Sequence, residues 1–289
     1  MIAGSIGIYI LWLYMGAGLS AYFYIPATIF FSGMLYRYLS EWLHEGIHYN
    51  IHPDRNINEF VSGWLLAPLM GTPLKQIRKA HFVHHGATQY FGDDDPDTRY
   101  LRIRSRSGFF KGVISDISGL SALSVYWAVV LRKVFTPRPR QNEDGSANSI
   151  GAFLIDYVPV ASINALLLAV AVLTVSLPQL LMTYAGLLCV YPVLSRLRAY
   201  GQHLPLSADG HWMAEASTGA RSVEGTLWDR LFIASRLMLY HHEHHLYPAL
   251  PYRALIAIKE AVEGDPNRYT RSHWPVLWAL MMPEAKSAR

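Results

Sequence analysis

At residues 240–248 the chain reads Tyr-His-His-Glu-His-His-Leu-Tyr-Pro, and this stretch decides how the rest can fold. In a helix, residues three and four positions apart share one face, so His241, His244 and His245 would project together. His242 would point about 100° away from His241. Neutral imidazole is the commonest protein ligand for transition metals. The stretch therefore predicts half of a metal site, although a histidine tract alone can also be a solvated surface patch.

Three further segments supply histidines, two of them with helical spacing. One has histidines at i and i+4, the second repeats i, i+3, i+4, and the third supplies a single residue. The nine residues predicted as metal ligands are His44, His48, His81, His84, His85, His203, His241, His244 and His245. Because Cys189 is the only cysteine, nitrogen and oxygen ligands must hold the metal. Iron, zinc, copper and manganese all remain open on ligand type.

The composition indicates that much of the chain faces lipid or a large core. Of its 289 residues, 52% are hydrophobic and 16% charged, against roughly 25% charged in a typical soluble domain. The isoelectric point is near 9.1, but no basic run with interleaved aromatic residues or nucleic-acid motif is present. We expect no nucleic-acid partner, and we assign the excess positive charge to the flanks of membrane spans.

Two long uncharged runs, residues 1–36 and 157–195, predict two membrane hairpins. Each is too long for one span of about 20 residues and has the length of two spans joined by a tight turn. The expected spans are residues 2–17, 21–40, 152–175 and 179–197, with turns near residues 16–20 and 176–178. The sequence therefore predicts an all-α polytopic membrane protein with four transmembrane helices.

Both hairpin turns lack lysine and arginine, whereas the segments at the other ends of the spans are rich in them. The positive-inside rule then places those segments, both termini and every histidine segment in the cytoplasm. We expect one domain over residues 1–289, with a cytoplasmic helical cap formed by residues 41–150 and 198–289. The apolar stretch 60–72 is expected either at the membrane interface or packed on the soluble part, and the stretch 117–131 is expected at the interface. Residues 136–149 are expected to form a polar loop.

A zinc protease is a remote alternative. Residues 44–48 read His-Glu-Gly-Ile-His, the HExxH pattern in which two histidines bind zinc and the glutamate is the base. Such a zinc takes three protein ligands and water, which would leave most of the nine histidines unused. Two metal ions can use them all. The protease alternative would make Glu45 indispensable. Transport is disfavoured because transport sites lie at mid-membrane, whereas these histidines lie outside the expected spans.

These motifs resemble the membrane fatty acid desaturase and hydroxylase superfamily over about residues 35–260. The three histidine boxes of that family correspond to His44–His48, His81–His85 and His241–His245. The family's continuation HHLYPxxPYxxL matches residues 244–255, and its threonine and Asp-Pro-Asp match Thr88 and residues 95–97. The additional family histidine corresponds to His203, although Gln202 stands where many relatives have glutamate.

The resemblance implies a cytoplasmic cap that holds two non-haem irons and uses O2 to oxidise an unactivated aliphatic C–H bond. Desaturation of a fatty acyl or lipid-like substrate is the leading reaction. Hydroxylation of a lipid, carotenoid or small natural product is the alternative, because the same boxes serve both. The nine histidines are then the metal ligands, and no separate acid or base is assigned.

Further residues are expected to support the ligands or the electron supply. Metal-bound histidines usually donate their second N–H to a carboxylate or carbonyl group. Candidates for such supporting roles are Asp93, Asp94, Asp95, Asp97, Gln202, Asp229 and His242. His52, His211 and His273 fit no box and are expected to be ordinary polar residues. Electrons must come from an external ferredoxin, rubredoxin or cytochrome-type carrier with its reductase. Basic residues that include Lys75, Arg78 and Lys79 would either dock this carrier or contact the anionic headgroups of membrane lipids.

Overall fold

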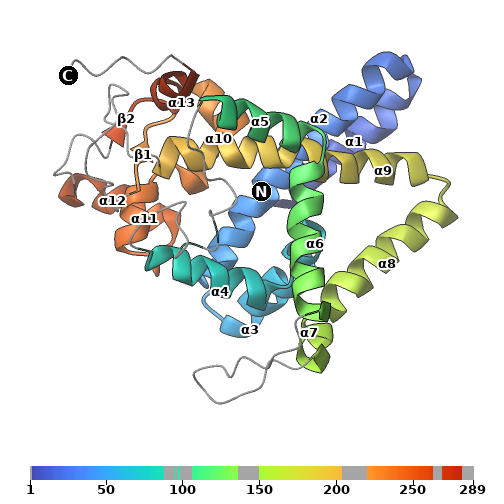
Figure 1. Ribbon diagram of the computed structural model, residues 1–289, viewed down its shortest axis with the longest axis horizontal. Coiled ribbons are helices and arrows are strands. Elements are labelled where there is room, and N and C mark those ends of the chain that lie inside the picture. Colours follow the sequence, from blue (N-terminus) through green and yellow to red (C-terminus); the bar gives the residue numbers. More distant parts are fainter. Residues whose placement is uncertain are drawn as a thin grey trace.

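The computed structural model describes residues 2–87, 95, 97, 106–135, 150–203, 220–262 and 269–281. Within these ranges the regular structure is helical, as predicted (Figure 1). The exception among the described residues is a parallel pair of two-residue strands, β1 (Ser222–Val223) and β2 (Tyr269–Thr270). The predicted loop 136–149 lies outside the described residues.

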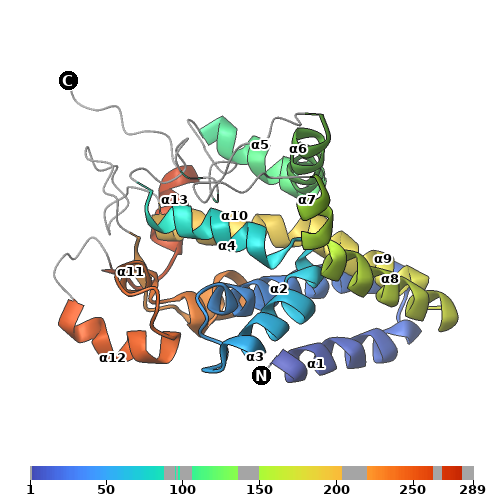
Figure 2. The ribbon, with the colours of Figure 1, turned by 90° about the horizontal axis from the view of Figure 1, so that it is seen from below.

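Both predicted hairpins are present. The first joins α1 (Ile2–Met15) to α2 (Ala21–Ile47) through a short 3₁₀ turn at Gly16–Gly18. The second joins α8 (Val158–Leu173) to α9 (Leu177–Ala185), with its turn within two residues of the predicted position. Figures 1 and 2 show the tips of both hairpins at the same end of the molecule. The helix containing α9 then continues through a π-turn, Gly186–Val190, into α10 (Tyr191–His203).

The helices of the two hairpins differ in length. One helix, Leu177–His203, is long and apolar enough to cross a membrane by length and composition. At 27 residues it measures about 40 Å. In contrast, α1 has 14 residues and α8 has 16, or about 21 and 24 Å, below the roughly 30 Å of a hydrocarbon core. Four membrane crossings therefore remain a prediction.

The other described helices are distributed among the opposite end of the molecule, the face over α10 and the sides of α2 and α8 (Figure 2). They are α3 (Arg55–Phe60), α4 (Leu74–His85), α5 (Arg106–Ile117), α6 (Leu120–Phe135), α7 (Ile150–Asp156), α11 (His241–Leu246), α12 (Tyr252–Val262) and α13 (Trp274–Met281). The apolar stretch 117–131 is broken by Gly119 at φ +77° between α5 and α6. The stretch 60–72 forms π and 3₁₀ turns that pack against α2.

The rotation of α2 is set by an apolar stripe. Tyr36, Leu39, Leu43 and Ile47 recur at helical spacing and form a buried cluster with residues 66–74. Removing this face from water contributes about 25 cal/mol of folding free energy per Å² of apolar surface buried. A second stripe, Arg37, Glu41, His44 and His48, follows the same helical period and is also buried. Packing of the apolar stripe therefore directs these polar side chains into the protein interior.

Glycines allow α2 to cross the second hairpin at close range. An added Cβ at Gly186 would lie 2.6 Å from the Gly33 nitrogen and 2.6 Å from the Ile29 carbonyl oxygen. An added Cβ at Gly33 would lie 2.4 Å from the Val190 side chain. Small residues at such a crossing let two helix backbones approach closely. This contact holds α2 and the α9–α10 helix in one relative position.

Two arginines near the expected span ends are buried and paired. Arg37 forms an ion pair of 2.7 Å with Glu41 on α2. Arg196 on α10 forms a two-point ion pair with Asp116 on α5, and its guanidinium also donates to the Tyr200 hydroxyl at 2.9 Å. Buried charges are tolerated only when paired and hydrogen-bonded. Arg196 therefore connects α10 to α5, while Arg37 reaches another segment through a bond from its guanidinium to the Leu231 carbonyl at 3.4 Å.

Candidate metal centre

Four helical segments bring the nine predicted ligands together. The C-terminal end of α2 supplies two, α4 supplies three, the end of α10 supplies one and α11 supplies three. They form two groups, each able to hold a metal ion, in which the ligand atoms lie within 4.8 Å of one another. One group is His44, His48, His81, His85 and His244, and the other is His84, His203, His241 and His245.

The two groups divide the histidine boxes. On α4, His81 and His85 join the group of five, while His84 joins the group of four. On α11 the i, i+4 pair His241 and His245 joins the group of four, and the residue at i+3 joins the other. The groups adjoin, because the rings of His85 and His245 stack with centroids 4.3 Å apart. Each of these two helices therefore contributes to both groups.

The ring nitrogens converge as metal ligands do. Nε2 of His241 lies 2.9 Å from Nε2 of His203, and Nε2 of His85 lies 3.1 Å from that of His81 and 3.2 Å from that of His244. Two nitrogens at right angles around one ion, each about 2.1 Å from it, lie about 3.0 Å apart. Both ring nitrogens of His44 and Nε2 of His48 are buried without a hydrogen-bond partner among the described residues. The site fits metal ions, because binding would satisfy these nitrogens.

Burial keeps the histidines neutral. Removal from water, and then the neighbouring histidines, lowers the pKa of His48 to about 2 and that of His85 to about 3. The pKa values of His241 and His244 also fall well below the ordinary value for the same reasons. A neutral imidazole has a free lone pair, which is the form that binds a metal. The site is therefore in its ligating state at neutral pH.

Two of the predicted supporting carboxylates contact ligand histidines. An oxygen of Asp97 lies 2.7 Å from Nδ1 of His81, and an oxygen of Asp95 lies 3.0 Å from Nδ1 of His84. A carboxylate that accepts the Nδ1–H fixes the tautomer in which Nε2 is free for a metal. Burial raises the pKa of Asp97, but the bond from His81 and the charge interactions with His81 and His84 together outweigh burial and leave that pKa below its ordinary value. Asp93 and Asp94 lie outside the described residues.

Three predicted supporting residues have other contacts. The Asp229 carboxylate accepts from the N–H and Nδ1 of His273, at 3.0 and 2.9 Å, and from Thr226, and none of these partners is a predicted ligand. Gln202 donates to the Met238 carbonyl and so connects α10 to the segment before α11. The ring of His242 lies 5.9 Å from that of Tyr269, outside both histidine groups. Folding brings His273, 44 residues distant in sequence, to Asp229, which local spacing cannot reveal.

The histidines that fit no box have structural contacts where they are described. His273 is fully buried against Asp229. Its ring approaches Gly201, where an added Cβ would lie 2.3 Å from the imidazole. His52 accepts the backbone N–H of Asp54 in the turn before α3. His211 lies outside the described residues.

Sequence reasoning missed the residues that hold the end of α2. The last carbonyls of a helix have no partner within it. Asn58 donates to the Gly46 carbonyl at 3.0 Å, and Arg78 donates to the carbonyls of Gly46 and Ile47 at 3.0 Å each. Arg78 precedes His81 by one turn of α4, so it fixes the first two boxes relative to each other. The spacing of three residues between Arg78 and His81, which places both on one face of a helix, could have indicated this role from the sequence.

Arg78 is therefore a poor candidate for docking an electron carrier. Its side chain is 13% exposed and also pairs with Glu59 at 2.8 Å. Lys75 and Lys79 on the same helix are exposed. The last carbonyls at the buried end of α2 require hydrogen-bond donors. The long side chain of Arg78, one turn before His81, reaches these carbonyls and donates to them.

Glu41 links α2 to the segment before the third box. Its carboxylate is fully buried and accepts the backbone N–H of Ser235 at 3.0 Å, in addition to its ion pair with Arg37. Ser235 begins the short turn that leads into α11. The buried stripe of α2 thus positions the third box as well as carrying the first.

A cavity of about 210 Å³ lies beside the histidines. Its wall includes ligand candidates from both groups, among them His44 and His203. Leu43, Ile47 and Met238 supply apolar surface, and Arg198 is the cation on its wall among the described residues. The space can admit an aliphatic group next to both metal positions.

The carboxylate of Glu45 does not face the histidine groups. Its oxygen accepts the N–H of Tyr252 at the start of α12, at 3.4 Å. Burial raises the pKa of Glu45 to about 7. A zincin base has to activate water on the zinc, and Glu45 contacts a helix terminus instead. The zinc protease alternative therefore has no support from this geometry.

The fold and the site define a helical protein with a two-part, histidine-rich metal centre. Its sequence matches the family described as fatty acid desaturase over residues 19–276, and the chain belongs to that family. This match confirms the resemblance inferred from the boxes. None of the curated proteins compared with the chain matches it. Family membership supports iron-dependent oxidoreductase chemistry.

Proposed function

We propose that this protein is a non-haem diiron enzyme that uses O2 to oxidise an unactivated aliphatic C–H bond. The observation that carries the proposal is the pair of adjoining histidine groups beside one cavity. The group of five and the group of four would each hold one iron, leaving coordination positions open in both. Non-haem iron oxygenases require such open positions. Bound iron supplies the activation of O2 that allows a strong C–H bond to be broken.

The protein's own residues would orient and shield this chemistry. Asp95 and Asp97 hold His84 and His81 in the tautomer that directs Nε2 inward. Arg78 and Asn58 hold the end of α2, and Glu41 holds the segment before α11. The ligand candidates are buried or half-buried, which limits access of bulk water to a reactive centre.

Desaturation of a fatty acyl or lipid-like substrate is the leading reaction. The apolar residues of the cavity wall support an aliphatic substrate. Hydroxylation of a small substrate is the second candidate. The cavity volume favours a small substrate over a long chain. About 210 Å³ lies below the roughly 300–1,000 Å³ of sites that enclose a drug-sized ligand. A long chain would therefore have to extend beyond the cavity.

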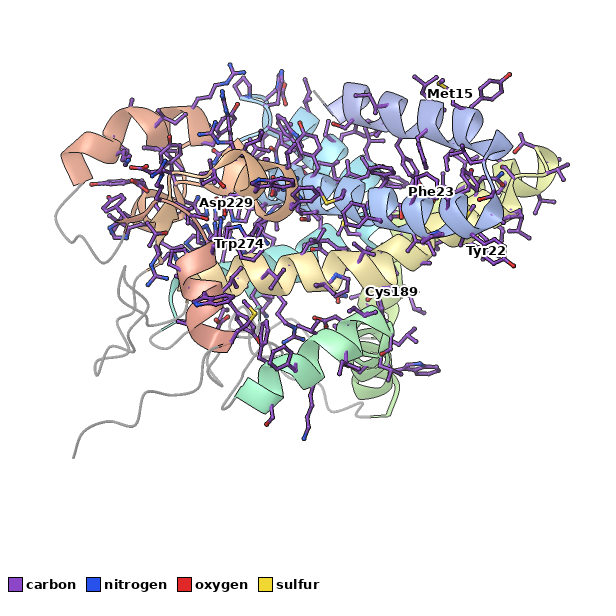
Figure 3. All side chains as sticks on the ribbon, turned by 90° about the horizontal axis from the view of Figure 1, so that it is seen from above. Met15, Tyr22, Phe23, Cys189, Asp229 and Trp274 are labelled. Atoms are coloured by element: carbon purple, nitrogen blue, oxygen red, sulfur yellow. The ribbon has the colours of Figure 1, made fainter. Side chains whose placement is uncertain are left out.

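We further propose that the two hairpins insert into a membrane from the cytoplasmic side. The hairpins expose large apolar side chains that include Tyr14, Tyr22 and Val175, which are 84%, 96% and 88% exposed. Figure 3 shows Met15, Tyr22 and Phe23 at the outer end of the first hairpin. Soluble monomers rarely expose apolar patches of more than a few hundred Å². Insertion of the shorter α1 and α8 would require local thinning of the bilayer.

Electrons would come from a separate carrier protein. Forming a double bond with O2 consumes two electrons and two protons and releases two waters. An iron–sulfur cluster is held by four cysteine thiolates, and this sequence supplies a single cysteine. A ferredoxin, rubredoxin or cytochrome-type donor with its reductase is the proposed partner, and the exposed Lys75 and Lys79 could contact it.

Metal analysis and product identification test the function. Purified protein should contain close to two irons per chain, and one zinc without iron would contradict the proposal. Expression in a lipid-rich host with a reductase system, followed by mass spectrometry, should reveal a product 2 Da lighter for desaturation or 16 Da heavier for hydroxylation, from elementary mass balance. His203→Ala and His241→Ala should abolish the product, whereas His242→Ala should retain some.

Topology is tested by labelling. After Cys189→Ser, single cysteines placed in the hairpin turn near residue 18 and near residue 280 should react from opposite sides of sealed vesicles. Reaction of both positions from the same side would contradict insertion of the first hairpin as a membrane-spanning unit. Loss of the protein from membranes after a carbonate wash would contradict integral insertion altogether.

A further inference from the structure

Arg198, the cation on the cavity wall among the described residues, has no role as a metal ligand that would explain its position there. Ser195, Arg198, Ala199 and Gln202 all line the cavity and recur at i, i+3, i+4 and i+7 along α10. This spacing defines one helix face. Arg196 lies on a different face, where it is buried against Asp116. Two arginines two residues apart therefore have different surroundings, and only Arg198 lines the cavity.

Arg198 has no counter-ion within the described part of the chain. It forms no hydrogen bond or ion pair there. Asp97 is the carboxylate on the cavity wall among the described residues, and it is already bonded to His81. The nearby histidines add no negative charge in either protonation state, and bound metal ions would add positive charge. A half-buried guanidinium in such surroundings is stabilised by an anion that binds in the cavity.

We propose that Arg198 binds the carboxylate head of the substrate inside this cavity. A planar guanidinium matches a carboxylate in a two-point hydrogen-bonded pair. Leu43, Ile47 and Met238 would then contact the aliphatic part of the same molecule. The inference rests on the proposed function and narrows it to aliphatic carboxylic acids, in preference to neutral hydrocarbons or carotenoids.

The position of Arg198 also limits where such a substrate would react. Arg198 and His203 are five residues apart on α10, which corresponds to about 7.5 Å along the helix axis. The cavity has room for about seven groups of roughly 30 Å³ each. The oxidised carbon would therefore lie only a few bonds from the carboxylate. Arg198 is a specificity-determining residue in this proposal.

Binding of matched probes tests the assignment without catalysis. Octanoate and octanamide have the same chain, whose end would extend beyond the cavity equally in both, and nearly the same head shape, but they differ in charge. We expect octanoate to bind the metal-free protein in detergent about tenfold more tightly than octanamide, as measured by calorimetry. Arg198→Gln should remove the preference and Arg198→Lys should keep part of it. Arg253→Gln, at an exposed arginine bonded only to Tyr252 among the described residues, should leave the preference unchanged.

Two outcomes would overturn the inference. One is wild-type protein that binds both probes equally or binds neither, and this result does not depend on any variant folding. The other is an Arg198→Gln protein that keeps the preference for octanoate. Iron content separates the two proposals: two irons with no carboxylate preference would refute only the role of Arg198. A protein without iron would refute the diiron function, while the metal-free binding measurement would still report on Arg198.

Discussion

At the scale of single residues, two carboxylates contact histidines of the candidate metal centre. Asp95 is fully buried beside His84, and Asp97 is bonded to His81. A buried carboxylate that accepts an imidazole N–H also raises the basicity of the other ring nitrogen. Each carboxylate supports a histidine from a different group, so removing either one would disturb a different metal position.

Replacement of either carboxylate by its amide should weaken metal binding. For Asp95→Asn and Asp97→Asn we expect a loss of about 10- to 100-fold in iron affinity, because the negative charge is removed while the shape is kept. Titration with a chelator, followed by iron analysis, measures the change. Asp156→Asn is the matched control, because among the described residues Asp156 pairs only with Lys75, at 3.8 Å. Unchanged iron retention in both variants would show that these carboxylates do not support the ligands.

At the scale of helices, the crossing of α2 with the α9–α10 helix positions the first box against His203. The crossing depends on Gly33 and Gly186, which leave no room for a side chain. Backbone atoms of α2 occupy the space that a Cβ at Gly186 would need. Backbone cannot rotate away as a flexible side chain can, so the two helices would have to separate.

Gly186→Ala should therefore destabilise the protein although alanine is the better helix former. We expect a loss of about 1–3 kcal/mol, the typical cost of an overpacked contact. Thermal unfolding in detergent, followed by tryptophan fluorescence, measures it. Gly7→Ala on α1 is the control, since a Cβ there meets nothing within 4 Å, and it should leave stability unchanged or slightly raised. Equal melting temperatures for the two variants would argue against a tight crossing.

At the scale of the whole molecule, folding concentrates neutral histidines that the unfolded chain would leave in water. The folded pKa of His85 is about 3 and that of His48 about 2, while free histidine titrates near about 6.5. Between these values the unfolded chain binds more protons than the folded chain. Stability is therefore fully present above about pH 6.5 and is lost as the pH falls toward 3.

The metal-free protein should accordingly melt at a progressively lower temperature from pH 7 to pH 5. Iron should raise the melting temperature at pH 7, because it binds the folded site and shifts the folding equilibrium. The benefit should shrink toward pH 5, where protons compete for the same ring nitrogens. Scanning calorimetry with and without iron measures both effects. A metal-free melting temperature that rises on acidification would contradict the neutral, buried state of these histidines.

Most of the helical pattern and the ligand candidates were predictable because they depend on local spacing. The positions of His241, His244 and His245 on one helix, the two hairpins, and the carboxylates after the second box follow from short-range periodicity and chain order. The lengths of α1 and α8 were less predictable, since hydropathy marks apolar runs but not where a helix ends.

The sequence by itself determined which residues can bind metal, because ligand chemistry and helical spacing are local properties. Only the tertiary structure decided how α4 and α11 divide their histidines between two groups. It also decided that Asp229 pairs with His273, that Arg78 holds the end of α2, and that Arg198 lines the cavity. These contacts join segments far apart in the chain, and their geometry depends on how whole helices pack and rotate against one another.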